Sequence, residues 1–135
     1  MLEGRRFWFV GIGGAGMSAL ALVAKEWGAE VGGSDRARSS YVERLEAAGV
    51  PVVIGHEAAN VPDRAEVIVL GCAGMADLAA RLSESHGLPV IDGVASAVKL
   101  AEAFGALGLK TSKIGAYAPP RPKPYLGSFA PFEPR

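Results

Sequence analysis

Short apolar runs alternate with amphipathic segments along residues 1–108. The first run, residues 7–10, is too short for a helix of its own, and its lack of polar positions is typical of a strand buried in a parallel sheet. The pattern predicts strands at residues 7–10, 29–33, 51–54, 66–70 and 89–92, helices at about 17–27, 40–48, 77–85 and 94–107, and a single turn before Pro62. This alternation predicts an α/β fold, a doubly wound, Rossmann-like sheet of five parallel strands in the order 3-2-1-4-5.

Helical spacing also predicts which side chains face the core. Gly28, Gly49 and Gly87 are the expected ends of the first three helices. The expected inward positions are Leu20, Val23, Ala24 and Trp27 in the first helix, Tyr41, Leu45 and Ala48 in the second, and Val94, Val98, Ala101 and Leu107 in the last.

The composition changes after Gly108. Six of the nine prolines lie in residues 109–135, where neither helical nor strand spacing is found. Proline-rich segments of this kind form extended arms. We therefore expect a single α/β domain over residues 1–108 and an extended, proline-rich C-terminal arm over 109–135.

Charge and cysteine content narrow the class of protein. Residues 1–108 hold 9 Lys and Arg against 13 Asp and Glu, so we expect no nucleic-acid partner. The single cysteine, Cys72, excludes an internal disulfide and suits a reducing cytosol. The uncharged residues 7–24 after Arg5 and Arg6 imitate a signal peptide or membrane span, but glycines at 11–16 interrupt them. We therefore expect a cytoplasmic protein with no membrane partner.

A glycine cluster between the first strand and the first helix is the strongest functional signal. Gly11, Gly13, Gly14 and Gly16 satisfy the pattern G-x-G-x-x-G. Without side chains, the turn lets backbone N–H groups approach a pyrophosphate or other anion at a helix N-terminus. The alternative is a tight turn that only packs helix against strand. Asp35, nineteen residues after Gly16, is either a ribose-binding carboxylate or a turn residue.

Residues 9–18 are Phe-Val-Gly-Ile-Gly-Gly-Ala-Gly-Met-Ser, and this run resembles the N-terminal domain of UDP-N-acetylmuramate–L-alanine ligases. The resemblance continues through Gly33-Ser34-Asp35, Glu43-Arg44-Leu45 and Ile54-Gly55-His56, and covers about residues 7–69. It implies that the glycine-rich segment binds the UDP part of a substrate. It adds Ala15, Met17, Ser18 and His56 to the candidate site, with a locally bonded loop residue as the alternative for His56.

Ligase chemistry needs more than this segment. In the ligases that the segment resembles, a separate central domain with a glycine-lysine loop binds ATP. No G-x-x-x-x-G-K-[ST] pattern occurs in the 135 residues, so we expect no ligase catalysis from them.

From about Ala65 onward the chain resembles the C-terminal part of hydantoin and aspartate/glutamate racemases. The resemblance rests on residues 70–78, on Pro89-Val90-Ile91-Asp92-Gly93-Val94, and on Lys110-Thr111-Ser112-Lys113 with the arm. Those enzymes use two cysteines, and Cys72 matches the second. We expect Cys72 to be an accessible, somewhat reactive remnant thiol without turnover, activated by loop N–H groups and the following helix. The alternative is a small, partly buried apolar residue.

Both families place an apolar strand after an Ala-Glu or Ala-Asp pair, as at Ala65-Glu66. We therefore interpret the chain as a chimera, engineered or recombined, that joins a ligase-like fragment 1–67 to a racemase-like fragment 68–108. A natural, divergent Rossmann-like protein is the alternative. Asp92 is expected to cap the last helix.

Three functions remain open. The first is a domain without intact catalysis that requires no cofactor and binds UDP, phosphate or sulfate. The second is an NAD(P)-binding domain, and the third is a cysteine-dependent racemase that works only as an oligomer. His56 and His86 lie far apart in sequence, so no metal site is expected. A homodimer is a further expectation, because a parallel edge strand and an apolar face would be left uncovered.

Overall fold

A computed structural model describes residues 1–75, 77–110, 112–115, 118 and 123–133. The chain divides into two compact units, Met1–Leu100 and Ala101–Arg135. The predicted boundary at residue 108 stays a prediction. The elements are β1 (Arg6–Val10), α1 (Ala15–Glu26), β2 (Glu30–Asp35), α2 (Ser40–Ala47), β3 (Val52–Ile54), the 3-10 turn η1 (Ala58–Asn60), β4 (Val67–Leu70), the 3-10 turn η2 (Ala73–Met75), α3 (Leu78–His86), β5 (Val90–Asp92), α4 (Gly93–Ala106) and the 3-10 helix η4 (Gly127–Phe132).

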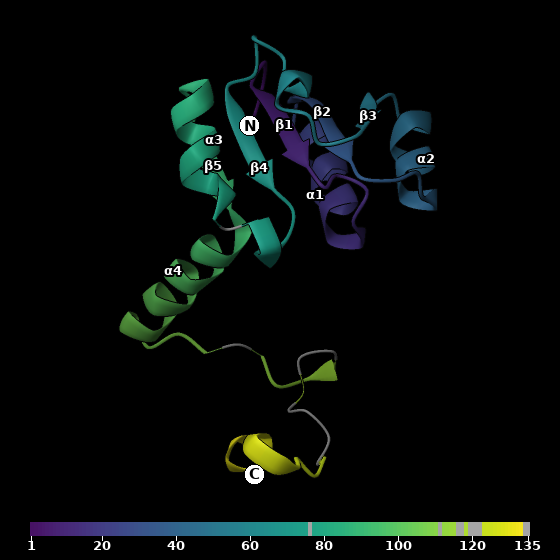
Figure 1. The fold of residues 1–135 in the computed structure, drawn as a ribbon. Helices are drawn as coiled ribbons and strands as arrows, with labels where there is room; N and C mark the ends of the chain where they lie inside the picture. Colours follow the sequence, from purple (N-terminus) through teal and green to yellow (C-terminus); the bar gives the residue numbers. More distant parts are fainter. Residues whose placement is uncertain (76, 111, 116–117, 119–122, 134–135) are drawn as a thin grey trace. The chain divides into compact units, whose positions relative to one another are not determined.

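The five strands of the first unit form one parallel sheet in the order β3-β2-β1-β4-β5 (Figure 1). The predicted fold class and strand order are therefore confirmed. β1 is central, and its last residue, Val10, pairs with Ser34 of β2 and with Leu70 of β4. The loops that leave β1, β2 and β4 consequently start at one edge of the sheet.

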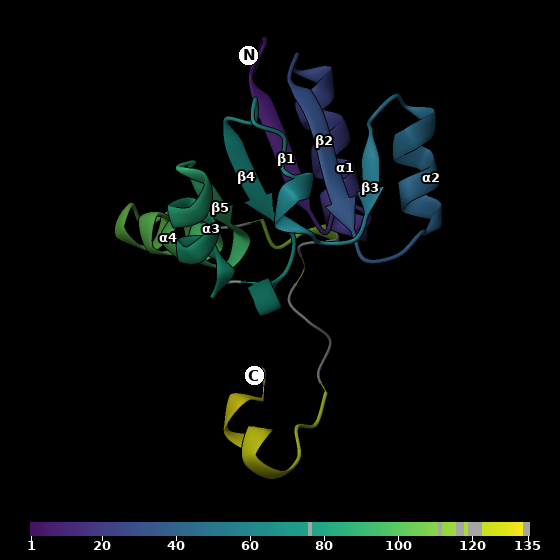
Figure 2. The same ribbon diagram turned by 45° about the horizontal axis from the view of Figure 1, so that its top comes forward.

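Each face of the sheet has its own buried cluster. On one face, Phe9 of β1 packs with Ala21 and Ala24 of α1 and with Leu45 of α2. Figure 2 shows α1 behind β1 and β2. On the other face, a second cluster joins strand and α3 side chains, including Trp8, Val10, Ile68, Leu70, Leu78 and Leu82. Alternate residues of β1 and β4 feed the two clusters, as the pleat of a strand requires.

The predicted helix faces are wrong in three places. α1 buries Ser18, Ala21 and Ala24, whereas Leu20 and Trp27 are 50% and 48% exposed. Residues 15–24 contain almost no polar side chain, so spacing could not select a face, and the small alanines allow a closer approach to the sheet. In α2, Val42 and Leu45 are buried while Tyr41 is exposed.

α4 also departs from the expected pattern, because none of its described residues is buried. Val94 and Val98 are exposed, and so is Leu107, which follows the end of the helix. Asp92 caps the helix as predicted, since its carboxylate oxygens accept the N–H groups of Val94 at 3.1 Å and Ala95 at 3.0 Å. Within the described residues, no helix is both long and apolar enough to cross a membrane.

The second unit contains the end of α4 and the helix η4, which the sequence did not predict. Its apolar side chains lie largely in solvent, with Ile114 82% and Leu126 81% exposed. Short range hydrogen bonds hold η4, such as the 3.3 Å bond from the Glu133 N–H to the Ala130 carbonyl.

Glu66 ties the start of β4 to the start of β1. Its carboxylate lies 3.0 Å from Arg5 Nε and 2.9 Å from Arg6 Nη2, and accepts the Arg6 N–H at 3.2 Å. The pKa of this carboxyl falls below its ordinary value of 4.5, first because of the backbone N–H of Arg6 and then because of the Arg6 guanidinium.

The first prediction concerns Gly33, where a methyl group would collide with the Phe9 carbonyl and lie 2.8 Å from Ile12 Cδ1. Gly33→Ala is expected to lower the free energy of unfolding by about 1–3 kcal/mol, because the buried backbones cannot separate freely. Gly16→Ala is the matched control, since nothing lies within 4 Å of a Cβ there, and a slight gain in stability is expected. Urea denaturation measures both. Equal effects of the two substitutions would contradict the assigned close approach.

The second prediction concerns pH. The Glu66 carboxyl has a lower pKa in the folded protein than in the unfolded chain. Its ionised form therefore stabilises the fold at pH values above the unfolded-state pKa. This stabilisation is lost as the pH falls through the folded-state pKa. Glu66→Gln is therefore expected to be less stable than the parent at pH 7, with the difference shrinking below the ordinary pKa of 4.5. Urea denaturation at pH 7 and at acid pH tests this expectation. A difference that grew on acidification would show that the ion pairs are not its cause.

Candidate functional site

The turn between β1 and α1 is anchored on β2. Gly11 has a φ of +77°, which an L side chain rarely adopts. The N–H groups of Gly11 and Ile12 both donate to the Ser34 carbonyl, at 2.8 and 3.1 Å, and the Gly14 N–H donates to the Gly11 carbonyl at 3.2 Å. The first half of the glycine cluster therefore uses its donors to build the turn.

Asp35 completes that internal bonding. Its Oδ2 accepts the Gly13 N–H at 2.7 Å, and its Oδ1 accepts the Ala37 N–H at 3.4 Å. A Cβ on Gly13 would lie 2.7 Å from Val42 Cγ2 and 2.8 Å from Asp35 Oδ2. Gly13 is thus required for packing, and the Asp35 carboxylate stabilises the turn, while its role in ribose binding stays a prediction.

The first turn of α1 leaves backbone donors available. The first helical bond runs from the Ser18 N–H to the Gly14 carbonyl at 2.8 Å. Within the described residues, the N–H groups of Ala15, Gly16 and Met17 have no acceptor, and the first turn carries no acidic side chain. Three such donors at the positive end of a helix can hold a phosphate-sized anion.

Gly16 gives this helix end an open approach. A Cβ at Gly16 would meet nothing within 4 Å. Ser18, by contrast, is buried, and its hydroxyl donates to the Ala15 carbonyl at 3.1 Å. Of the candidate residues on α1, Ala15, Gly16 and Met17 therefore present donors, whereas the Ser18 side chain faces its own helix.

His56 lies in the loop after β3, and its ring contacts the carboxyl end of β2. Its Nδ1 is 3.1 Å from the hydroxyl of Ser34, which is buried. The imidazole itself is exposed. The ring therefore has a partner on a neighbouring strand, and a role of His56 in binding stays a prediction.

The loop after β4 lies directly beside the glycine turn. A Cβ on Gly71 would be 2.7 Å from the Val10 carbonyl oxygen and 3.1 Å from that of Gly11. Gly71 itself is not among the candidate site residues that the sequence predicts. The signal that could have found it is a glycine directly after each of two neighbouring strands, at residues 11 and 71.

Cys72 follows Gly71 and is exposed, as predicted. A hollow of about 380 Å³ is lined by Cys72, Met17, Leu70, Gly93 and Val94 among others, so the thiol and the first turn of α1 share one depression. The turn directly after Cys72 is the three-residue η2, and α3 begins only at Leu78. Among the described residues, no three His, Cys, Asp or Glu side chains gather as metal ligands.

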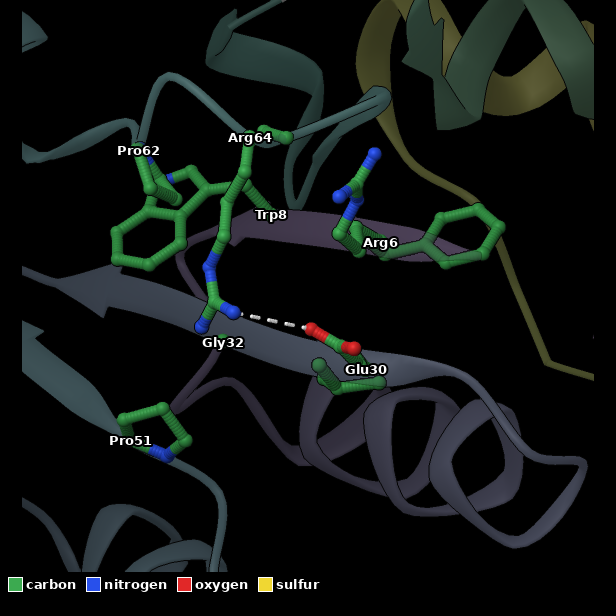
Figure 3. Close-up of a pocket in the computed structure, with 10 residues that line it drawn as sticks. Arg6, Trp8, Glu30, Gly32, Pro51, Pro62 and Arg64 are labelled. Atoms are coloured by element: carbon green, nitrogen blue, oxygen red, sulfur yellow. Dashed lines mark ion pairs between the residues drawn. The ribbon is translucent and has the colours of Figure 1, made fainter. Parts of the chain in front are cut away.

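A smaller pocket of about 70 Å³ lies at the amino ends of β1 and β2 (Figure 3). Arg64 pairs with Glu30 there, with 3.3 Å between Nη1 and Oε2, and Gly32 lies beneath the Trp8 indole. Its volume suits water-sized molecules and not a nucleotide. This edge of the sheet is opposite to the glycine turn.

The third prediction tests the bonding of Asp35. Asp35→Asn is expected to lower the free energy of unfolding by about 1 kcal/mol at pH 7, because a charge-assisted hydrogen bond to Gly13 becomes a neutral one. Asp63→Asn is the control, since Asp63 is exposed and lies in the loop before β4. Urea denaturation compares the two. An equal effect at both sites would rule out a structural role for the Asp35 carboxylate.

Comparison with known proteins places the chain near two groups of enzymes. The family model "Mur ligase family, catalytic domain" matches residues 6–105, farther than the expected end of the ligase resemblance at residue 69. A hydantoin racemase of Rhizobium meliloti is 55% identical over 71 residues, which are 53% of this chain and 30% of that enzyme. A UDP-N-acetylmuramate–L-alanine ligase of Burkholderia ambifaria is 45% identical over 95 residues, which are 70% of this chain and 20% of that enzyme.

A solved structure shares the fold. The murein peptide ligase of Psychrobacter arcticus is 29% identical, with a TM-score of 0.56 over 67% of this chain and 19% of that protein. The chain spans less than a third of the length of these relatives. The ligase and racemase matches cover different parts of the chain. They also overlap, because the 95 residues of the one and the 71 residues of the other together exceed the 135 residues of the chain. Because the family model matches most of the chain, including all five strands, the chain belongs to the Mur ligase family.

Proposed function

We propose that this chain is a nucleotide-binding α/β domain that holds the diphosphate of a UDP-like ligand at the first turn of α1 and has no catalytic turnover. The observation that carries the proposal is the set of three N–H donors at Ala15, Gly16 and Met17, which find no acceptor within the described residues. They project from a helix end that no acidic side chain neutralises.

The choice of a uridine nucleotide rests on the family. The ligase from Burkholderia ambifaria is named for a UDP-linked substrate, and it is 45% identical to this chain over 95 residues. Free phosphate or sulfate would use the same donors, because all three ligands present tetrahedral oxyanions.

The absence of turnover is supported by what the 135 residues contain. They hold a single cysteine and no G-x-x-x-x-G-K-[ST] pattern. A racemase with two thiols would need a second copy of Cys72 facing the same substrate. An oligomeric racemase is therefore the weaker candidate, supported by the exposure of Cys72 in the hollow beside α1.

An NAD(P)-binding domain is the other candidate. Its supporting feature is Asp35, placed at the end of β2. The Asp35 carboxylate already accepts the Gly13 and Ala37 N–H groups, so a ribose would have to share or displace these bonds. This bonding favours the uridine ligand over the dinucleotide.

The proposal includes a chimeric origin with the join at β4. Ligase and racemase relatives match different parts of the chain. β4 is buried along its whole length and pairs with β1 on one side and β5 on the other. An apolar strand of either parent could fill this position. A cytoplasmic location and a homodimer stay predictions.

The fourth prediction separates ligand binding from folding. Gly16→Asp is expected to weaken UDP binding at least tenfold, because a carboxylate then occupies the anion's approach, while the same charge favours the helix N-terminus and stability is kept. Gly105→Asp is the matched control, since a Cβ there also meets nothing within 4 Å. Calorimetric titration with UDP-N-acetylmuramate, UDP and NADH measures the affinities. Tighter binding of NADH than of UDP would favour the dinucleotide, and unchanged UDP affinity in Gly16→Asp would remove the site.

A further inference from the structure

The helix α4 carries a broad apolar stripe that nothing in the chain buries. None of its residues is buried. With about 3.6 residues per turn, one half of its surface holds only apolar side chains and glycine, at Val94, Ala97, Val98, Leu100, Ala101, Phe104 and Gly105. The four large side chains of this stripe are between 43% and 58% exposed. Lys99 and Glu102 lie on the other half of the helix, so the stripe is uncharged. Exposed apolar surface of this kind marks an interaction site.

The stripe begins in the hollow beside Cys72. This hollow of about 380 Å³ is lined by side chains from α4, the sheet and α1, among them Val94, Ala97, Val98, Leu70 and Met17. An apolar cavity of about 150 Å³ holds one benzene ring. The hollow therefore has room for an aromatic side chain, although its shape alone does not say which one.

The order of small and large residues along the stripe identifies the occupant. Its middle line reads Val94, Ala97, Ala101, Phe104, with small residues at the centre and large ones at both ends. When two such helices pack antiparallel about a two-fold axis, Ala97 of each faces Ala101 of the other, and Val94 faces Phe104. The small central residues allow the two helices to approach closely. The stripe is therefore complementary to itself, as a two-fold interface requires.

This pairing brings Phe104 of each copy to the hollow of the other, because Val94 belongs to the wall of that hollow. A parallel pairing would instead place Phe104 against Phe104 and leave both hollows empty. Repulsion between copies does not oppose the contact, since the formal net charge of the chain is zero.

We propose that two copies of this chain associate through antiparallel α4 helices, with Phe104 of one copy filling the hollow of Met17, Leu70 and Val94 in the other. The proposal goes beyond nucleotide binding, since no ligand takes part in the contact. It gives the predicted homodimer a definite interface.

Sedimentation equilibrium of the full chain under reducing conditions tests the assembly. A pair of short helices is a small interface, so a monomer–dimer equilibrium at micromolar concentrations is expected. Phe104→Glu is expected to raise the dissociation constant at least tenfold, because a carboxylate would have to enter an apolar hollow. Ala103→Glu is the matched control, since Ala103 is exposed on the other half of the same helix and no change is expected. Urea denaturation checks that both variants still fold.

Cys72 reports on the hollow itself, because its thiol is exposed in the single chain and lines the hollow. Its rate constant for alkylation by iodoacetamide is expected to fall as the protein concentration rises through the dimerisation range. In Phe104→Glu the rate constant is expected to stay the same over that range. An equal fall in both proteins would mean that another surface covers the thiol.

Cross-linking tests the antiparallel direction. Ala97→Cys and Ala101→Cys are each made together with Cys72→Ser, so that each chain has a single thiol. On mild oxidation, a mixture of the two variants is expected to form disulfide-linked dimers faster than either variant alone, because residue 97 faces residue 101 of the partner. A parallel pairing predicts the reverse, with faster cross-linking within each single variant.

Three results would overturn the proposal: a chain that stays monomeric at high micromolar concentration, a dimer that Phe104→Glu does not weaken, or slower cross-linking in the mixture than in the single variants. Dimerisation is measured without nucleotide, and UDP binding is measured by calorimetry. Failure of the nucleotide site therefore leaves this test intact, and failure here leaves the nucleotide site intact.

Discussion

The structure depends on how closely the backbone at the carboxyl end of β1 approaches its neighbours. The Phe9 carbonyl lies against Gly33 of β2, the Val10 carbonyl lies against Gly71 after β4, and Asp35 lies against Gly13. A side chain at Gly33 or Gly71 would collide with a backbone carbonyl of β1, whereas one at Gly13 would meet the side chains of Val42 and Asp35. The backbones of β2, β1 and the loop after β4 can approach this closely only because no side chain lies between them, and this approach fixes where the turn and the start of α1 lie.

The turn's own hydrogen bonds decide which donors a ligand can reach. The first four N–H groups of the turn are bonded within the protein. Those of Gly11 and Ile12 donate to the Ser34 carbonyl, that of Gly13 donates to the Asp35 carboxylate, and that of Gly14 donates to the Gly11 carbonyl. Only the next three N–H groups find no acceptor within the described residues. The glycine pattern alone does not distinguish the N–H groups that are bonded within the turn from those that are not, because all of its glycines have the same conformational freedom. The bonded half of the pattern fixes the position of the N–H groups that we propose to bind an anion, which would limit the entropy lost on binding.

The sequence predicted the sheet better than it predicted the helix faces or the site. Strand order followed from the alternation of elements and from the glycine turn after β1, both of which are local signals. The buried face of α1 could not be predicted in the same way, because apolar residues occur on more than one side of the helix. Ala21 and Ala24 face the sheet, where small side chains allow close packing, and Leu20 and Val23 are exposed. The partners of Asp35, His56 and Trp8 lie in other elements or are missing among the described residues, so only tertiary structure could reveal them.

The two faces of the sheet differ in a way that bears on the proposed join at β4. The buried residues of one cluster lie between Phe9 and Val50, apart from Val67 and Val69 of β4. The other mixes Trp8 and Val10 with Ile68, Leu70 and side chains of α3. If the join lies at β4, the first face keeps the packing of one parent, whereas the second combines side chains that did not evolve together. Incomplete packing is then expected on the second face, where Val10, Leu78 and Leu82 line a cavity of about 170 Å³ and the buried Trp8 indole N–H has no acceptor among the described residues.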